Sequence, residues 1–178
     1  MIGSRIIAAL AGAVLLVAAP LAAQAQISLE GGDQAQLEVG AGGYDFIGNH
    51  ATSEGIFRGE YRFDTKLWEL RPLLGAEVTT DTSSYIYGGF ALDVYFGDHW
   101  VLTPNEAVGF WSRGNREAEN LGSYVEFRSG AEFDYRFDNH SRLGVSFHHI
   151  SNAGLTQRNP GEEEALVTFS LPLGDFLP

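Results

Sequence analysis

A strict alternation of apolar and charged side chains over residues 122–137 constrains the fold of this chain more than any other feature. Val125, Phe127, Phe133 and Tyr135 share one set of alternate positions, and five charged residues from Glu126 to Arg136 occupy the other set. Successive side chains of a β-strand point to opposite faces, so a period of two predicts a strand with one apolar and one charged face. The pattern does not decide whether the apolar face meets a protein core or lipid.

Similar segments recur along the chain and predict an all-β fold of about eight antiparallel strands. The expected strands cover residues 37–46, 54–63, 67–79, 84–96, 99–111, 122–137, 141–151 and 163–173. The chain has 22 glycines, which suit tight turns between strands. It has no cysteine, which excludes disulfides, a thiol nucleophile and a thiolate metal site.

Residues 1–25 are expected to be a cleavable signal peptide, which leaves residues 26–178 as one domain. Arg5 precedes an apolar stretch from Ile6 to Ala19, and Ala23-Gln24-Ala25 has the small-x-small form of a cleavage site. The apolar stretch is shorter than the about 20 residues that a membrane-spanning helix needs, so a retained anchor is the weaker alternative. The formal net charge of −12 and the lack of a basic tract argue against a nucleic-acid partner.

Two folds fit the amphipathic strands: a soluble sandwich that buries its apolar face, and an outer-membrane barrel that turns this face to lipid. Short turns around Asp64, Gly97 and Asp138 alternate with longer loops, except for the short connection at 80–83. Even-numbered barrels with periplasmic termini have short periplasmic turns and longer external loops. We therefore expect an eight-stranded antiparallel transmembrane β-barrel in the bacterial outer membrane.

The interior of such a barrel is expected to be a polar plug and not a pore. An eight-stranded barrel is just wide enough for side chains to fill it. Charged residues of both signs occupy the expected inward positions, namely Arg58, Glu60, Arg62, Glu69, Arg71, Glu77 and Asp93. Trp68, Trp100 and Trp111 lie near expected strand ends and suit interfacial belts, although core aromatics would explain them nearly as well.

The last two expected strands carry the candidate chemistry. His149 and Ser151 alternate with the apolar, lipid-facing residues of 141–151, and the alternation of 163–173 selects Glu163 from three neighbouring acids. A hydroxyl, an imidazole and a carboxylate on one face fit acyl transfer by nucleophile, base and orienting acid. His148 points to the opposite face, which argues against a metal-binding histidine pair. With the N-terminus in the periplasm, the three residues lie at the external rim and face the outer leaflet.

The segment His149-Ile150-Ser151-Asn152-Ala153-Gly154-Leu155, followed by Asn159-Pro160-Gly161 and Glu163, resembles the signature of the PagL lipid A 3-O-deacylase family. The resemblance implies an eight-stranded outer-membrane barrel with Ser151 as nucleophile, His149 as general base and Glu163 as orienting acid. It implies hydrolysis of the ester-linked acyl chain at position 3 of lipid A, without metal or organic cofactor.

The loop after Ser151 offers candidate donors for an oxyanion hole. Asn152, Gly154 and Asn159 carry amide donors on a flexible backbone. Ordinary turn formation explains asparagine and glycine at these positions equally well.

Other functions fit the same strands. A non-catalytic barrel that serves as an anchor or adhesin explains the fold but gives no reason for polar residues at the lipid face. An outer-membrane phospholipase would use the same kind of catalytic triad. The expected partners are lipid A as substrate and the outer membrane. The sequence leaves a homodimer open.

Overall fold

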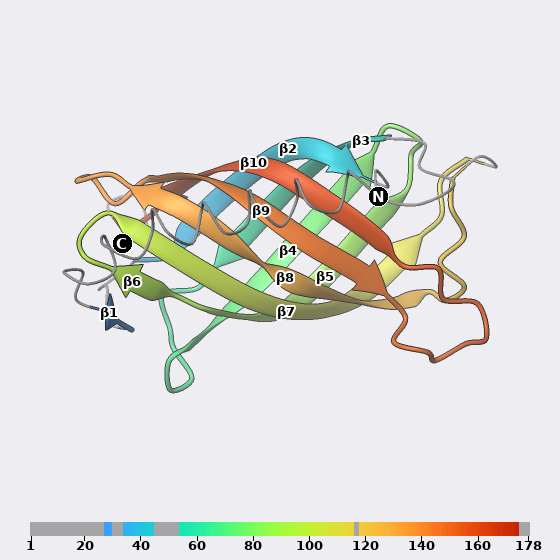
Figure 1. The fold of residues 1–178 in the computed structure, drawn as a ribbon, viewed down its shortest axis with the longest axis horizontal. Coiled ribbons are helices and arrows are strands. Elements are labelled where there is room, and N and C mark those ends of the chain that lie inside the picture. Colours follow the sequence, from blue (N-terminus) through green and yellow to red (C-terminus); the bar gives the residue numbers. More distant parts are fainter. Residues whose placement is uncertain (1–26, 30–33, 45–53, 116–117, 175–178) are drawn as a thin grey trace, which may run out of the picture.

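The computed structural model describes residues 27–29, 34–44, 54–115 and 118–174, and these form a closed antiparallel β-barrel (Figure 1). Eight strands build the barrel wall: β2 (Gln36–Tyr44), β3 (Glu54–Arg62), β4 (Leu70–Thr79), β5 (Ser84–Leu92), β7 (Trp100–Ser112), β8 (Val125–Arg136), β9 (Arg142–Ser151) and β10 (Glu162–Pro172). No helix in this part of the chain is long and apolar enough to cross a membrane. The expected signal peptide and the end of the first expected strand lie outside the described residues.

Each strand of the wall pairs with its sequence neighbours, and β10 pairs with β2 to close the barrel. The short strand β6 (Val94–Phe96) continues β5 along β7 after an interruption at Asp93, and β1 (Ile27–Ser28) pairs with β6. The eight-stranded transmembrane fold expected from the sequence is therefore confirmed. Three strand limits were wrong: 67–79 begins at Leu70, 84–96 is divided at Asp93, and 122–137 begins at Val125.

The alternation along each strand separates an apolar outer wall from a charged interior. Inward guanidinium groups meet carboxylates across the barrel: Arg58 Nη2 lies 3.0 Å from Glu38 Oε1, and Arg71 Nη1 lies 2.6 Å from Asp93 Oδ2. Buried charges need such partners because burial removes their hydration. The expected ion-paired interior is confirmed except at Glu69, which lies in the turn before β4 with its carboxylate 3.8 Å from Lys66 Nζ.

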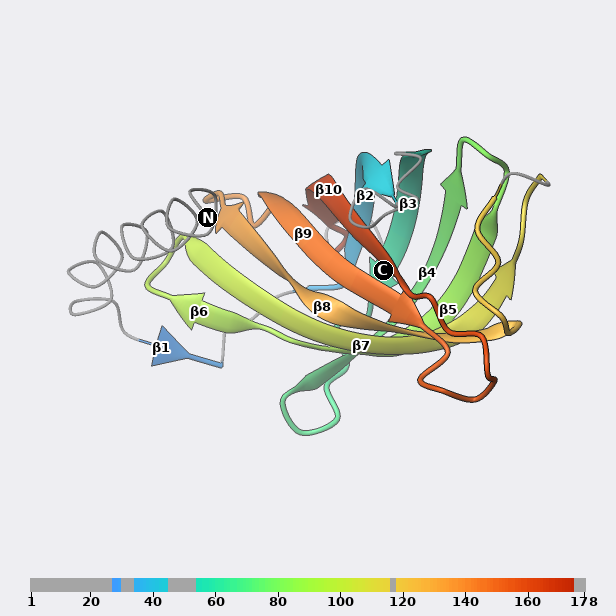
Figure 2. The same cartoon turned by 45° about the vertical axis from the view of Figure 1, so that its right-hand side comes forward.

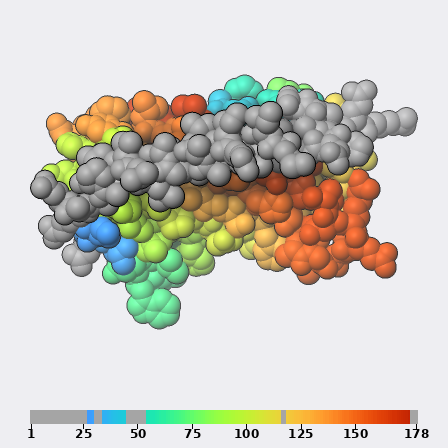
Figure 3. Space-filling model, in the orientation of Figure 1, coloured from blue at the N-terminus to red at the C-terminus, as the bar shows by residue number. Residues whose placement is uncertain are grey.

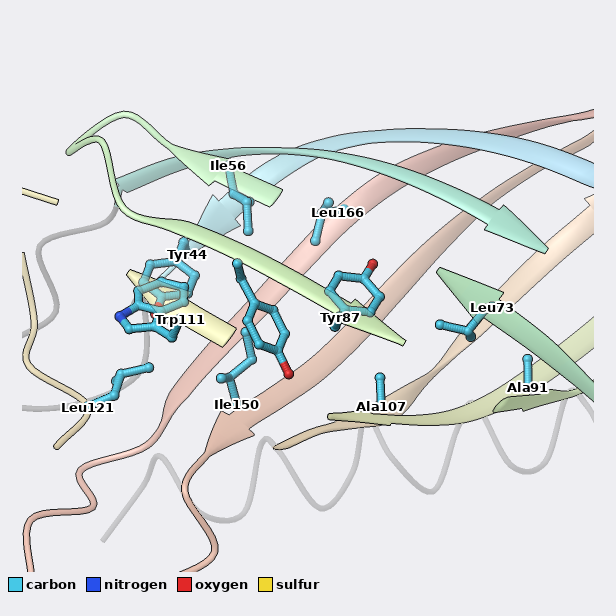
Figure 4. Close-up of a cluster of buried hydrophobic side chains, with 11 residues drawn as sticks. Tyr44, Ile56, Leu73, Tyr87, Ala91, Ala107, Trp111, Leu121, Ile150 and Leu166 are labelled. Carbon is cyan, nitrogen blue, oxygen red and sulfur yellow. The ribbon is translucent and has the colours of Figure 1, made fainter. Parts of the chain in front are cut away.

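A cluster of buried hydrophobic side chains also lies inside the barrel (Figure 4). Tyr44 stacks on Trp111 with ring centroids 5.7 Å apart, and Leu121 and Ile150 belong to the same buried cluster. Trp111 is only 4% exposed, so of the two alternatives that the sequence left open it is a core aromatic and not part of an interfacial belt. It shares the inward face of β7 with Val101 and the other alternate residues of that strand.

The two ends of the barrel differ. The longer connections 113–124 and 152–161 lie together at one end, which we call the loop end (Figures 1 and 2). The first residue of β2, the last residue of β10 and the short turn 137–141 lie at the opposite end, which we call the turn end. The candidate active-site residues are at the loop end.

Candidate active site

His149 and Glu163 face each other across neighbouring strands on the outside of the barrel. The antiparallel register makes them direct partners in the β9–β10 ladder. His149 Nδ1 lies 3.3 Å from Glu163 Oε1, and the two side chains are 44% and 24% exposed. With Nδ1 directed to the carboxylate, Nε2 is the nitrogen left to serve a nucleophile. The pair therefore has the geometry of a base and its orienting acid.

Two hydroxyl groups lie near this imidazole. Ser151 is two residues further along β9 on the same outward face, as the alternation predicts. Ser129 of β8 lies directly opposite His149, on the side away from Glu163. Among the residues that the structure describes, neither serine forms a hydrogen bond to His149. The structure thus brings His149 and Glu163 together and places Ser151 on the same face without a hydrogen bond to the imidazole. The sequence had not drawn attention to Ser129.

Gly161 lies against the His149 ring immediately before β10. A Cβ atom at this position would come within 2.5 Å of His149 Cε1 and 3.0 Å of Nε2. The glycine also has a φ of +70°, which side chains rarely adopt. A residue with a side chain here would push the imidazole away, so Gly161 helps to set the position of the ring. The sequence pointed to Gly161 only as part of the Asn159-Pro160-Gly161 segment and did not predict its contact with His149.

Asn152 anchors the loop that follows Ser151. Its side chain is fully buried, and its Nδ2 lies 2.8 Å from the carbonyl oxygen of Leu121 and 2.7 Å from that of Arg158. A third acceptor, Thr156 Oγ1, lies at 3.1 Å. These bonds join the start of the β9–β10 loop to its own end and to the β7–β8 loop. The Asn152 side-chain amide is therefore engaged inside the loops.

The other two expected oxyanion donors differ in whether their N–H groups are already hydrogen-bonded. Gly154 N donates to Asn152 Oδ1 at 3.0 Å, and Asn152 N donates to Asn159 Oδ1 at 2.9 Å. Asn159 Nδ2 has no hydrogen-bond partner among the described residues. Asn159 is thus the expected donor with a side-chain N–H group available to a ligand.

The turn Asn152–Leu155 is tight and strained. Leu155 N donates to Asn152 O at 3.0 Å, while Ala153 and Gly154 have φ values of +52° and +79°. A positive φ at both central residues is the hallmark of a type I′ turn, which favours glycine or asparagine over alanine. The chain accepts this strain directly beside the candidate nucleophile.

A polar clamp joins the two long loops at their exposed side. Arg158 Nη2 lies 2.6 Å from Glu119 Oε1, and Arg158 Nε donates to the carbonyl of Asn120 at 2.7 Å. Gly122 lies so close that a Cβ atom there would be 2.1 Å from the Arg158 carbonyl oxygen. The β7–β8 and β9–β10 loops therefore form one packed unit beside the His149–Glu163 pair.

The neighbours of the candidate residues point into the barrel. His148 Nδ1 lies 3.2 Å from Glu164 Oε1 in the charged interior, and Glu162 is 3% exposed. The sequence-based choice of His149 and Glu163 as the outward residues agrees with this placement. Within the described ranges, no cluster of three or more histidine, aspartate or glutamate residues is arranged to hold a metal ion.

Comparisons with known proteins point in one direction. A family model described as lipid A 3-O-deacylase (PagL) matches residues 55–172. A solved structure described as the crystal structure of the outer membrane enzyme PagL is similar, with a TM-score of 0.63 and 21% sequence identity. The similarity covers 77% of this chain and 99% of that one. A search of curated proteins gives no match.

Proposed function

Because this chain belongs to the PagL family of lipid A 3-O-deacylases, we propose that it hydrolyses the ester at position 3 of lipid A by a Ser-His-Glu mechanism. The observation that carries the proposal is the His149–Glu163 pair, 3.3 Å apart on the outer wall of a membrane barrel. Partly exposed polar groups are costly on a lipid-facing surface, so their presence there calls for a functional reason. A substrate whose ester lies in the membrane supplies that reason.

In the proposed reaction, Ser151 Oγ attacks the ester carbonyl while His149 Nε2 accepts the hydroxyl proton. The bond between the carbonyl carbon and the sugar oxygen then breaks, and the imidazolium donates its proton to the departing sugar oxygen. Water, activated by His149, next hydrolyses the acyl-enzyme and releases the fatty acid. Glu163 holds the ring through Nδ1 and stabilises the imidazolium. A rotation of the Ser151 side chain would have to form the hydrogen bond to the ring, since the two groups are not hydrogen-bonded in this structure.

The proposed oxyanion donors lie in the 152–159 loop. The Asn159 Nδ2 group is the first candidate because it has no partner among the described residues. The N–H groups of Asn152 and Gly154 donate within the loop and can serve an oxyanion only if those bonds exchange. Preorganised donors at this point stabilise the charge that develops on the carbonyl oxygen.

The site is proposed to face the outer leaflet, with the turn end in the periplasm and a signal peptide at residues 1–25 for export. Short turns at one end and longer loops at the other support this orientation. The acyl chains would then lie along the apolar wall formed by Phe147, Val145 and their neighbours, and the ester would meet the triad at the rim.

Mass spectrometry of lipid A from cells that export the protein tests the proposal. We expect loss of one 3-hydroxyacyl chain with the parent protein and a fall in turnover of several orders of magnitude with Ser151→Ala or His149→Ala. Ser129→Ala is the matched control because it removes the other hydroxyl beside His149, and it should retain activity.

Folding of each variant is checked by heat-modifiable migration in gels. If Ser151→Ala is active and Ser129→Ala is inactive, Ser129 is the nucleophile and not Ser151. Unchanged lipid A with folded parent protein would favour the anchoring barrel, and release of lysophospholipid would favour a phospholipase.

A further inference from the structure

The connection between β3 and β4 extends beyond the barrel wall as a small hairpin of residues 63–70. Phe63 N donates to Pro72 O at 3.0 Å at its base. Leu67 and Leu70 exchange backbone hydrogen bonds of 2.8 and 3.1 Å at its tip. Trp68, the first residue of the two-residue turn, has a φ of +57°. A left-handed conformation costs a bulky residue about 1–2 kcal/mol, so the hairpin holds a tryptophan where glycine would fit best.

The tip of this hairpin is apolar and exposed. Trp68 is 93% exposed and Leu67 is 53% exposed. Lys66 Nζ donates to the carbonyl oxygen of Leu29 at 3.1 Å and so connects the hairpin to the segment that contains β1. We call the combined apolar surface the hairpin patch, and its residues are Ile27, Leu29, Leu67, Trp68 and Leu70.

The hairpin projects sideways from the barrel near the turn end, and not along the barrel axis (Figures 2 and 3). It lies next to β1 in the space-filling view. On β4 the exposed residues Leu70, Leu74 and Val78 form a continuous outward row that joins the hairpin patch to the lipid-facing wall. With the barrel axis along the membrane normal, this hairpin runs across the membrane surface at the turn end.

Two side chains of the hairpin have the chemistry of an interfacial anchor. Tryptophan is enriched at membrane–water interfaces because its ring is apolar and its N–H group is polar. Lys66 is the only lysine in the chain, and its partly exposed ammonium lies 3.8 Å from the Glu69 carboxylate within the same hairpin. An apolar stem with a charged tip suits the same boundary.

We propose that residues 63–70, together with Ile27 and Leu29, form a lateral anchor that inserts Trp68 and Leu67 into the headgroup region of phospholipids at the turn end of the barrel. The anchor lies at the opposite end from His149 and Glu163. It is therefore independent of the reaction that the protein catalyses.

Site-directed spin labelling of the folded protein in vesicles of phosphatidylethanolamine and phosphatidylglycerol tests the anchor. The chain has no cysteine, so Leu67→Cys provides a unique attachment site that keeps Trp68 in place. Ile86→Cys, on the outer wall at a residue that is 67% exposed, gives the lipid reference. Asp138→Cys, in the short turn at the same end as the hairpin, gives the water reference. The measurement is the ratio of oxygen to nickel-chelate accessibility.

We expect the label at residue 67 to have a ratio several-fold above that at residue 138 and closer to that at residue 86. Adding Trp68→Ser to Leu67→Cys should move the ratio toward the water reference. A ratio at residue 67 equal to that at residue 138 would overturn the proposal, because the hairpin would then lie in water. Protection from both reagents with dipolar broadening between labels would overturn it in favour of a second copy of the chain.

Discussion

Replacement of Asn152 by alanine should release the loop beside the candidate active site without unfolding the barrel. Asn152 Nδ2 has two hydrogens and three acceptors, at 2.7, 2.8 and 3.1 Å. We count two hydrogen bonds for this nitrogen, because one hydrogen must be divided between two acceptors. Oδ1 accepts a third bond from Gly154 N at 3.0 Å. At about 1 kcal/mol of net stability for each bond, the substitution lowers the free energy of loop opening by about 3 kcal/mol.

Limited proteolysis with trypsin measures this opening. Cleavage after Arg158 requires the loop to open, and the cleavage rate follows the population of the open form when opening and closing are fast. A loss of about 3 kcal/mol predicts a rate increase on the order of 100-fold. Leu155→Ala is the matched control, because this exposed side chain lies in the same loop and its substitution keeps every bond of Asn152. A rate for Asn152→Ala within about threefold of the parent would refute the anchoring role, given the 3 kcal/mol expected from its bonds.

Three further predictions follow from the geometry. Ala153→Gly relieves about 1 kcal/mol of left-handed strain, so tryptic cleavage of the loop should slow about fivefold; an unchanged rate would contradict the strain. Gly161→Ala should displace the His149 ring and lower turnover on lipid A by about 100-fold while the barrel stays heat-modifiable, and full activity would show that the ring is not held there. Arg62→Ala removes the nearer of two arginine partners from three buried carboxylates, Glu38, Glu60 and Glu132, and should cost about 3–5 kcal/mol in urea unfolding followed by tryptophan fluorescence. A midpoint equal to the parent's would exclude the ion-pair network as a source of stability.

The sequence predicted the barrel because one rule, the period of two, acts within each strand and needs no knowledge of distant residues. The same rule put His149 outward and His148 inward, and the structure agrees. The alternation also places Trp111 on the inward face of its strand, although its aromatic side chain near a strand end suggested an interfacial position as well. Trp111 packs on Tyr44 inside the barrel, and no local pattern shows that contact.

Features that depend on contacts between distant segments could not be predicted. Asn152 joins a carbonyl 31 positions earlier in the chain, and the sequence shows only an asparagine in a turn. Ser129 comes next to His149 through the β8–β9 register, which hydrophobic alternation alone does not fix. The sequence predicted a short turn around Asp64 and a strand from residue 67, whereas the hairpin extends to Leu70, where β4 begins.

The position of the His149–Glu163 pair on the outside of a filled barrel has a kinetic consequence. A substrate reaches such a site by lateral diffusion within the bilayer, and the rate follows its mole fraction among the surrounding lipids, not its bulk concentration. Dilution with inert lipid at constant total substrate would slow an enzyme built in this way, whereas dilution with buffer would leave its rate per vesicle unchanged.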